Sequence, residues 1–157
     1  MTHHHLSIGD QAPDFILINQ HEKKVTPMAI DGRRTLFSFH PLAWTTVCEI
    51  QMRTLELKNS TFDELEVIAY GISVDSAQSK KAWADAIGVT ETNLLADFWP
   101  HGEVADKYGL FNKDKGISGR ANVLIGRDHT IEWIREYELF QVPDIEEVID
   151  IISKLKQ

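Results

Sequence analysis

Alternating runs of apolar and polar residues divide the chain into short segments of strand and helix type. Continuous apolar runs of about four to eight residues are typical of buried strands, whereas apolar residues three and four positions apart indicate an amphipathic helix. The pattern predicts strands at residues 12–18, 24–26, 35–40, 65–74, 94–96, 121–125 and 130–137. It predicts helices at residues 45–59, 76–87, 102–108 and 143–155, and a loop rich in Gly and Lys at 113–119.

Residues that favour turns and caps support these boundaries. Pro41 ends the third strand, because proline cannot donate to a sheet ladder. Ser76 is expected to cap the second helix and Gly88 to end it. Residues 126–129 form the turn between the last two strands, and Pro143 is compatible with the start of the last helix.

The helix at 45–59 is predicted from its apolar positions at helical spacing. The residues expected on this face are Val47, Ile50, Thr54 and Leu57. The helix would carry Cys48 in its first turn, directly after the third strand.

The element order indicates an α/β fold, with a central sheet flanked by helices and an N-terminal β-hairpin over residues 12–26. The chain has 157 residues, of which 43% are hydrophobic, and this is enough to form the core of one globular domain. We therefore expect one domain over residues 1–157 without an internal linker, and a flexible segment at residues 1–7.

Charge and composition exclude several classes of partner. The net charge of −8 argues against nucleic-acid binding, which requires concentrated Lys and Arg. No run approaches the roughly 18 apolar residues of a membrane span, and the first residues lack the cationic and apolar regions of a signal peptide. A single cysteine suits a reducing compartment. We expect a soluble, cytoplasmic protein with no membrane or nucleic-acid partner.

Cys48 is the chain's only cysteine, and its position favours reactivity. It follows the carboxyl end of a strand and lies at a helix start, the edge of an α/β sheet where ligands bind. The helix N-terminus stabilises negative charge and therefore the thiolate, which is the nucleophilic form of the side chain. The alternative is a small buried hydrophobic side chain with no chemical role.

The segment around Cys48 resembles a known family. Pro41, Thr45 and Cys48 match the Pro-x-x-x-Thr-x-x-Cys signature of peroxiredoxins, and residues 97–102 (Asp-Phe-Trp-Pro-His-Gly) resemble the single-cysteine, AhpE-like subgroup. The resemblance extends from Ile8 to the final helix. It implies a thioredoxin-like fold with a mixed sheet, and a thiol-dependent peroxidase that reduces hydrogen peroxide and organic hydroperoxides through a sulfenic acid on the motif cysteine, without a cofactor or metal.

The resemblance also assigns roles around the thiol. Arg120, just before a late strand, is expected to supply a fixed positive charge, and Thr45 a hydroxyl donor. Pro41 is expected to screen the nucleophile from water. Trp44 and Val47 are expected to contact the substrate, with plain packing as the alternative for the tryptophan.

Two departures from the family pattern affect the mechanism. Gln51 stands where the family often has Glu, and its carbonyl can still orient a neighbouring donor. The chain has no resolving cysteine, so an external low-molecular-weight thiol or a thioredoxin- or glutaredoxin-like protein must recycle Cys48. The resemblance further implies a homodimer or a higher oligomer.

The histidines are interpreted as structural. His40 and His101 each stand alone, and the run at residues 3–5 indicates a terminal segment more than a metal site.

Two alternatives to a peroxidase remain: a redox-sensing or holdase protein that signals through oxidation of Cys48, and a silent thioredoxin-like interaction domain. A dithiol oxidoreductase is excluded, because the second cysteine of a Cys-x-x-Cys pair is missing.

Overall fold

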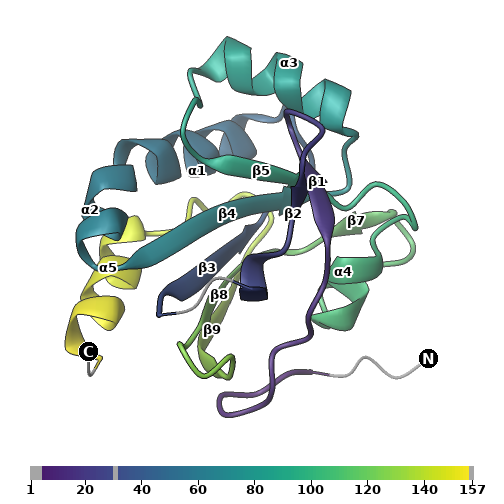
Figure 1. Ribbon diagram of the computed structural model, residues 1–157. Helices are drawn as coiled ribbons and strands as arrows, with labels where there is room; N and C mark the ends of the chain where they lie inside the picture. Colours follow the sequence, from purple (N-terminus) through teal and green to yellow (C-terminus); the bar gives the residue numbers. More distant parts are fainter. Residues whose placement is uncertain (1–4, 30–31, 156–157) are drawn as a thin grey trace.

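A mixed seven-stranded sheet forms the centre of the molecule (Figure 1). The computed structural model describes residues 5–29 and 32–155. The strand order is β2-β1-β5-β4-β3-β8-β9. The strands are β1 (Leu17–Asn19), β2 (Lys24–Val25), β3 (Arg34–Phe39), β4 (Val67–Ser73), β5 (Asn93–Ala96), β8 (Arg120–Ile125) and β9 (Ile131–Tyr137). A separate two-stranded sheet pairs β6 (Phe111–Asn112) with β7 (Ile117–Ser118).

The pairing confirms the expected mixed sheet. Strands β3, β4 and β5 run parallel, whereas β8 pairs antiparallel with β3 and with β9. Strands β1 and β2 form the predicted N-terminal hairpin, which joins the sheet along β5.

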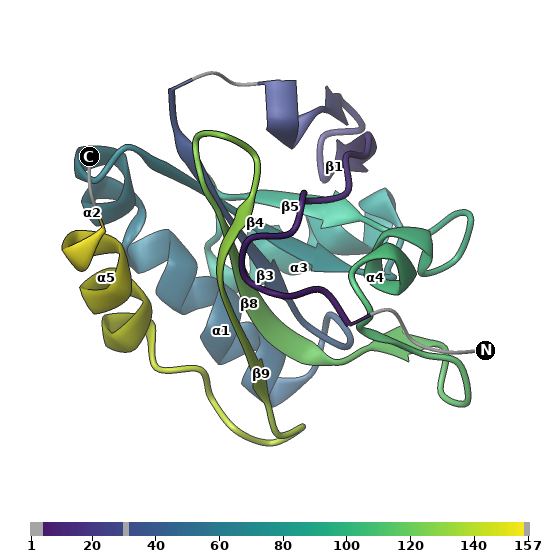
Figure 2. The same ribbon diagram turned by 90° about the horizontal axis from the view of Figure 1, so that it is seen from below.

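Helices cover both faces of this sheet (Figure 2). They are the 3-10 helix η1 (Pro27–Ala29) and the α-helices α1 (Thr46–Leu57), α2 (Asn59–Glu64), α3 (Ala77–Ile87), α4 (Glu103–Lys107) and α5 (Ile145–Lys154). Side chains of α1, α2, α3 and α5 form one apolar core with Leu36 and Leu124. Phe37, Phe39 and residues of α4 form the other. Alternate residues of β3 therefore face opposite cores, as the two-residue period of a strand requires.

Several predicted boundaries are confirmed by local contacts. The Ser76 side chain accepts a 3.2 Å hydrogen bond from the Ser79 backbone N–H at the start of α3. Gly88 ends α3 with φ of 78°, a left-handed conformation that glycine adopts without strain. Helix α5 begins later than predicted, at Ile145, because Asp144 caps it by accepting from the Glu146 N–H.

The predicted apolar face of α1 is wrong. Ile50 and Leu57 are 41% and 79% exposed. The residues that the helix buries are Cys48, Gln51, Met52 and Leu55. The face that packs on the sheet is thus turned by roughly one residue, about 100°, from the predicted one. This rotation carries the cysteine inward.

Three further differences concern short elements. Residues 12–16 were expected in a strand, but β1 begins only at Leu17. Helix α2 was not predicted, because Phe62 is its only buried residue and gives no periodic signal. Part of the expected loop at 113–119 pairs as β7.

The flexible segment expected at residues 1–7 falls largely on residues 1–4, which lie outside the described residues, and stays a prediction. In the described part of the chain, no helix has the length and apolar character needed to cross a membrane.

Candidate active site

Cys48 lies in the first turn of α1, beyond the carboxyl end of β3. Helix α1 begins at Thr46, so the sulfur lies at the positive end of the helix dipole. The side chain is fully buried in the core formed on the α1 face of the sheet. The site thus combines low solvent access with an environment that favours negative charge.

Arg120, the first residue of β8, contacts the thiol directly. Its Nη1 donates to Cys48 Sγ at 3.3 Å. On the opposite side of the guanidinium, Nε and Nη2 both donate to the Leu139 carbonyl, at 3.1 and 2.6 Å. The arginine is 4% exposed, so its charge is held at the sulfur with little screening by water.

Gln51 holds the same guanidinium from α1. Its Oε1 accepts a 2.8 Å hydrogen bond from Arg120 Nη1, which confirms that its carbonyl orients a neighbouring donor. Its Nε2 donates to Ser38 Oγ at 2.7 Å and to the Phe39 carbonyl at 3.1 Å, both on β3. An uncharged amide therefore links the Arg120 guanidinium to β3, the strand that precedes the loop at residues 40–45.

A mainly apolar cavity of about 410 Å³ lies beside Arg120. It is lined by Pro41, Leu42, Thr45, Thr46, Val47, Ile117, Arg120, Leu139 and Phe140. The structure therefore brings four of the sequence-predicted residues to one cavity: Pro41, Thr45, Val47 and Arg120. Thr45 Oγ1 donates to the Leu42 carbonyl at 2.7 Å, which fixes the turn that precedes α1.

Trp44 lies apart from this cavity. The residue adopts a left-handed backbone conformation, with φ of 70°, and is 57% exposed. Its indole Nε1 donates to Ser79 Oγ on α3 at 3.1 Å, and the residue is not among those that line the cavity. The expected contact between this side chain and substrate has no support in the geometry.

Sequence reasoning missed the contribution of the segment after β9. Leu139 supplies the carbonyl that anchors Arg120 and also lines the cavity, together with Phe140. Both side chains are exposed, at 41% and 83%. Their apolar character outside any periodic element was the one signal that could have marked them.

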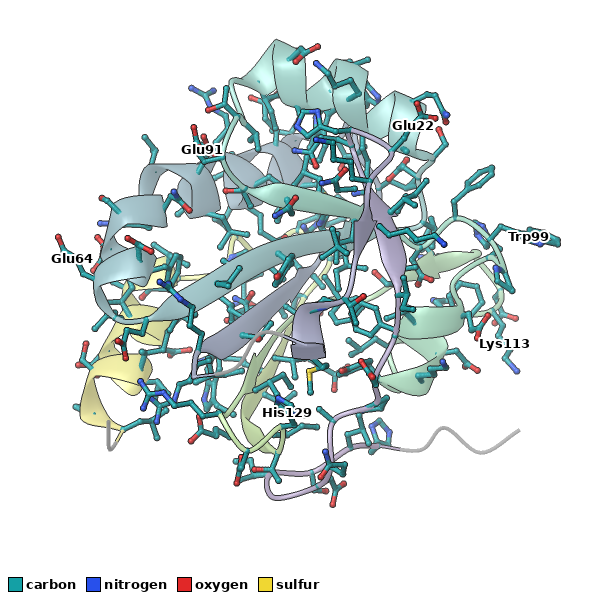
Figure 3. All side chains as sticks on the ribbon, viewed as in Figure 1. Glu22, Glu64, Glu91, Trp99, Lys113 and His129 are labelled. Carbon is teal, nitrogen blue, oxygen red and sulfur yellow. The ribbon has the colours of Figure 1, made fainter. Side chains whose placement is uncertain are left out.

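Residues 97–102 carry part of the family resemblance, and the structure gives them two different settings. Asp97 is buried, and its carboxylate accepts from the Val104 and Ala105 N–H groups at the start of α4. Burial raises the pKa of Asp97 to about 6, although these hydrogen bonds oppose the rise. Trp99 projects outward at the edge of the molecule and is 81% exposed (Figure 3).

Among the described residues, no group of three or more His, Cys, Asp or Glu side chains is placed to hold a metal ion. His3 and His4 of the N-terminal histidine run lie outside those residues.

Comparison with known proteins identifies clear relatives. Residues 8–134 match the model of the AhpC/TSA family. The chain is 35% identical over 140 residues to alkyl hydroperoxide reductase E of Mycobacterium tuberculosis, covering 88% of this chain and 91% of that protein. It is 31% identical over 132 residues to a thiol peroxidase of Streptococcus agalactiae, covering 84% and 78%. Among solved structures, the crystal structure of Enterococcus faecalis AhpC matches with a TM-score of 0.85 at 25% identity, covering 94% of this chain and 91% of that one.

Proposed function

Because this chain belongs to the AhpC/TSA family of peroxiredoxins, we propose that Cys48 is its peroxidatic residue and that Arg120, Thr45 and Pro41 complete the site. The chain is a thiol-dependent peroxidase with the thioredoxin-like fold predicted from its sequence. The observation that carries the site assignment is the 3.3 Å contact between Arg120 Nη1 and Cys48 Sγ.

The chemical step transfers two electrons from sulfur to the peroxide. The Cys48 thiolate attacks one peroxide oxygen, the S–O bond forms and the O–O bond breaks. The electron pair leaves with the second oxygen, which takes up a proton and departs as water or an alcohol. Negative charge moves from sulfur to the leaving oxygen, and the Arg120 guanidinium, in contact with the sulfur, supplies the fixed positive charge that stabilises this movement.

Gln51 and Leu139 act as positioning residues in this account. They accept hydrogen bonds from opposite sides of the guanidinium, so Arg120 does not need to reorganise when charge moves. Thr45 shapes the loop by the bond that its hydroxyl donates to the Leu42 carbonyl, and the residue lines the same cavity. Pro41 lines that cavity and limits the water around the nucleophile.

The cavity beside Arg120 favours organic hydroperoxides as substrates in addition to hydrogen peroxide. Most of its lining residues are apolar, and its volume of about 410 Å³ is large enough for the alkyl group of an organic hydroperoxide. We assign the alkyl part of the substrate to the wall formed by Val47, Ile117 and Phe140.

Regeneration of the enzyme requires a second molecule. Cys48 is the only cysteine, so its sulfenic acid has no internal thiol with which to condense. A low-molecular-weight thiol or a thioredoxin- or glutaredoxin-like protein forms a mixed disulfide with Cys48 and releases water, and a second thiol then frees the cysteine by exchange. The proposal includes a cytoplasmic setting, which keeps such thiols reduced, and a homodimeric or higher assembly.

Trapping the first product tests this function. The reduced protein is treated with one equivalent of an organic hydroperoxide in the presence of a sulfenic-acid-specific dione, and the adduct is located by mass spectrometry. We expect one adduct, on Cys48. In a separate assay with excess hydroperoxide and no dione, we expect peroxide consumption to continue only when an external thiol is added. Recovery of unmodified thiol together with intact hydroperoxide would reject Cys48 as the peroxidatic residue.

A further inference from the structure

A second cation is buried on the α3 side of the thiol. The Lys80 side chain is fully buried, and its Nζ lies 3.3 Å from His40 Nε2. Its neighbour Lys81 behaves as an ordinary helix-surface lysine, because it is exposed and pairs with Asp85 at 2.7 Å. Lysine is almost never fully buried unless it is paired, so the position of Lys80 calls for a partner of opposite charge.

His40 does not supply that opposite charge. It is fully buried at the end of β3, and its Nδ1 lies 3.3 Å from the Ser38 carbonyl, so Nδ1 carries the hydrogen and Nε2 accepts from the Lys80 ammonium. Burial lowers the pKa of His40 well below its usual value, and the charge of Lys80 acts in the same direction. The imidazole is therefore a neutral acceptor.

Three acidic groups on the surrounding elements act electrostatically on Lys80. They are Asp75 from the turn before α3, Asp97 from the end of β5 and Cys48 from α1. Burial lowers the pKa of Lys80 to about 8, while the negative charges of these three groups oppose that change. The lysine is thus mainly an ammonium at neutral pH.

Asp75 and Asp97 already have other partners. Asp75 accepts from the Ala43 N–H at 2.8 Å and from Ser73 Oγ at 2.6 Å. Asp97 accepts from two N–H groups at the start of α4. Of the three groups, only Cys48 changes its charge during the reaction, when the thiolate becomes a neutral sulfenic acid.

We propose that Lys80 is a second positioning cation for the Cys48 thiolate, acting across the protein interior from α3 while Arg120 acts by direct contact. The inference rests on the proposed function of Cys48. Attraction between the two groups is reciprocal, because an ammonium on Lys80 favours the thiolate and the thiolate favours the ammonium. The effect is transmitted well because both side chains are fully buried, where charges are screened less than at the surface.

The test is a pH titration of the thiolate by its ultraviolet absorbance in the reduced protein, without peroxide. Lys80→Met removes the charge and keeps a long unbranched side chain, and Lys81→Met is the matched control on the same helix. We expect the midpoint of the titration to rise by about one pH unit in Lys80→Met and to stay unchanged in Lys81→Met. An unchanged midpoint in folded Lys80→Met would overturn the proposal.

Lys80→Gln separates charge from hydrogen bonding. It offers an N–H donor toward His40 but no charge, so its midpoint should rise as in Lys80→Met; a midpoint equal to the parent's would contradict an electrostatic role. Removing one charge from a buried cluster is usually destabilising, so the folding of each Lys80 variant is verified by circular dichroism at the temperature of the titration. The titration contains no peroxide. A negative result for Lys80 can therefore be distinguished from a lack of peroxidase activity in the parent protein.

Discussion

Arg120 donates from Nη1 to the sulfur of Cys48 at 3.3 Å, across 72 residues of sequence. The contact joins the start of β8 to the first turn of α1. These two elements meet because β8 pairs with β3, and β3 leads through the loop at residues 40–45 into α1. Anchoring of the same guanidinium by the Leu139 carbonyl means that the cation is positioned before any peroxide arrives.

Removal of this cation should slow the reaction strongly. Arg120→Ala is expected to lower the rate constant for Cys48 oxidation at least about tenfold, because a fixed charge of this kind contributes more than about 1.4 kcal/mol to the barrier. Arg53→Ala is the control, since Arg53 is an exposed arginine of α1 that pairs with Glu49. A folded Arg120→Ala protein with the parent's rate constant would remove Arg120 from the mechanism.

Gln51 should matter through the orientation of Arg120. Gln51→Met keeps the length of the side chain but deprives Arg120 Nη1 of its 2.8 Å acceptor and Ser38 Oγ of a donor. We expect the rate of peroxide reduction to fall by up to about fivefold. The free energy of unfolding should fall by about 1–3 kcal/mol, because buried groups lose their hydrogen-bond partners. Stopped-flow kinetics and urea denaturation measure the two effects, and parent-like values in both would show that the orientation of Arg120 does not depend on Gln51.

Thr45 should contribute through its hydroxyl. Thr45→Val keeps the shape of the side chain but loses the 2.7 Å bond to the Leu42 carbonyl, so the loop before α1 is less well fixed. A hydrogen bond worth about 1 kcal/mol corresponds to a roughly fivefold loss in the rate of peroxide attack. Thr45→Ser retains the hydroxyl and should restore most of that rate; equal rates in all three proteins would place the important donor elsewhere.

Phe140 should select for apolar substrates. Its ring lines the cavity beside Arg120 while 83% of the residue stays exposed, so truncation should affect the pocket and leave the fold intact. We expect Phe140→Ala to lower the rate constant for a bulky alkyl hydroperoxide about fivefold, with no change for hydrogen peroxide. Leu57→Ala, on an exposed part of α1, is the control. A parallel loss for both peroxides would argue against a binding role.

Glu56, near the C-terminal end of α1, should make the stability of the protein depend on pH. Its carboxylate accepts from the backbone N–H groups of Thr90, Glu91 and Thr92. Burial alone would raise the pKa of Glu56, but these bonds lower it from 4.5 to about 2. Because the folded-state pKa lies below the unfolded value, the stabilisation is fully present above about pH 4.5 and is lost as pH falls through about 2.

Urea denaturation of Glu56→Gln measures this effect. The parent should be more stable than the variant by about 1 kcal/mol near neutral pH, since the carboxylate is only partly buried, and the difference should shrink in strong acid. A difference that does not vary with pH would mean that the carboxylate charge plays no part in holding the loop.

Local sequence signals were sufficient to place Cys48, the proposed nucleophile, at the start of a helix. The strand that ends at Pro41 and the helix that follows it put Cys48 in a first helical turn, and both elements are present. The position of Arg120 came from family resemblance alone, because the contact depends on the pairing of β3 with β8 and no local pattern reports it.

The orientation of α1 was not predictable from apolar periodicity. The helix exposes Ile50 and buries Cys48, Met52 and Leu55, which are also apolar and at helical spacing, together with the polar Gln51. Lys80 shows the same difficulty on α3, since a lysine is normally placed on the solvent face of a helix and here is fully buried beside His40. In each helix a polar side chain, Gln51 or Lys80, is buried beside a hydrogen-bond partner, and a hydrophobic pattern does not report such positions.

The most direct test of the account is stopped-flow mixing of the reduced protein with sub-stoichiometric hydrogen peroxide and, separately, an organic hydroperoxide, followed by tryptophan fluorescence. Cys48→Ser is the control. The account predicts oxidation much faster than that of free cysteine, abolished in Cys48→Ser, with the organic hydroperoxide accepted as a substrate. A rate no greater than that of free cysteine would contradict it, and would leave a thioredoxin-like domain whose motif is present but catalytically silent.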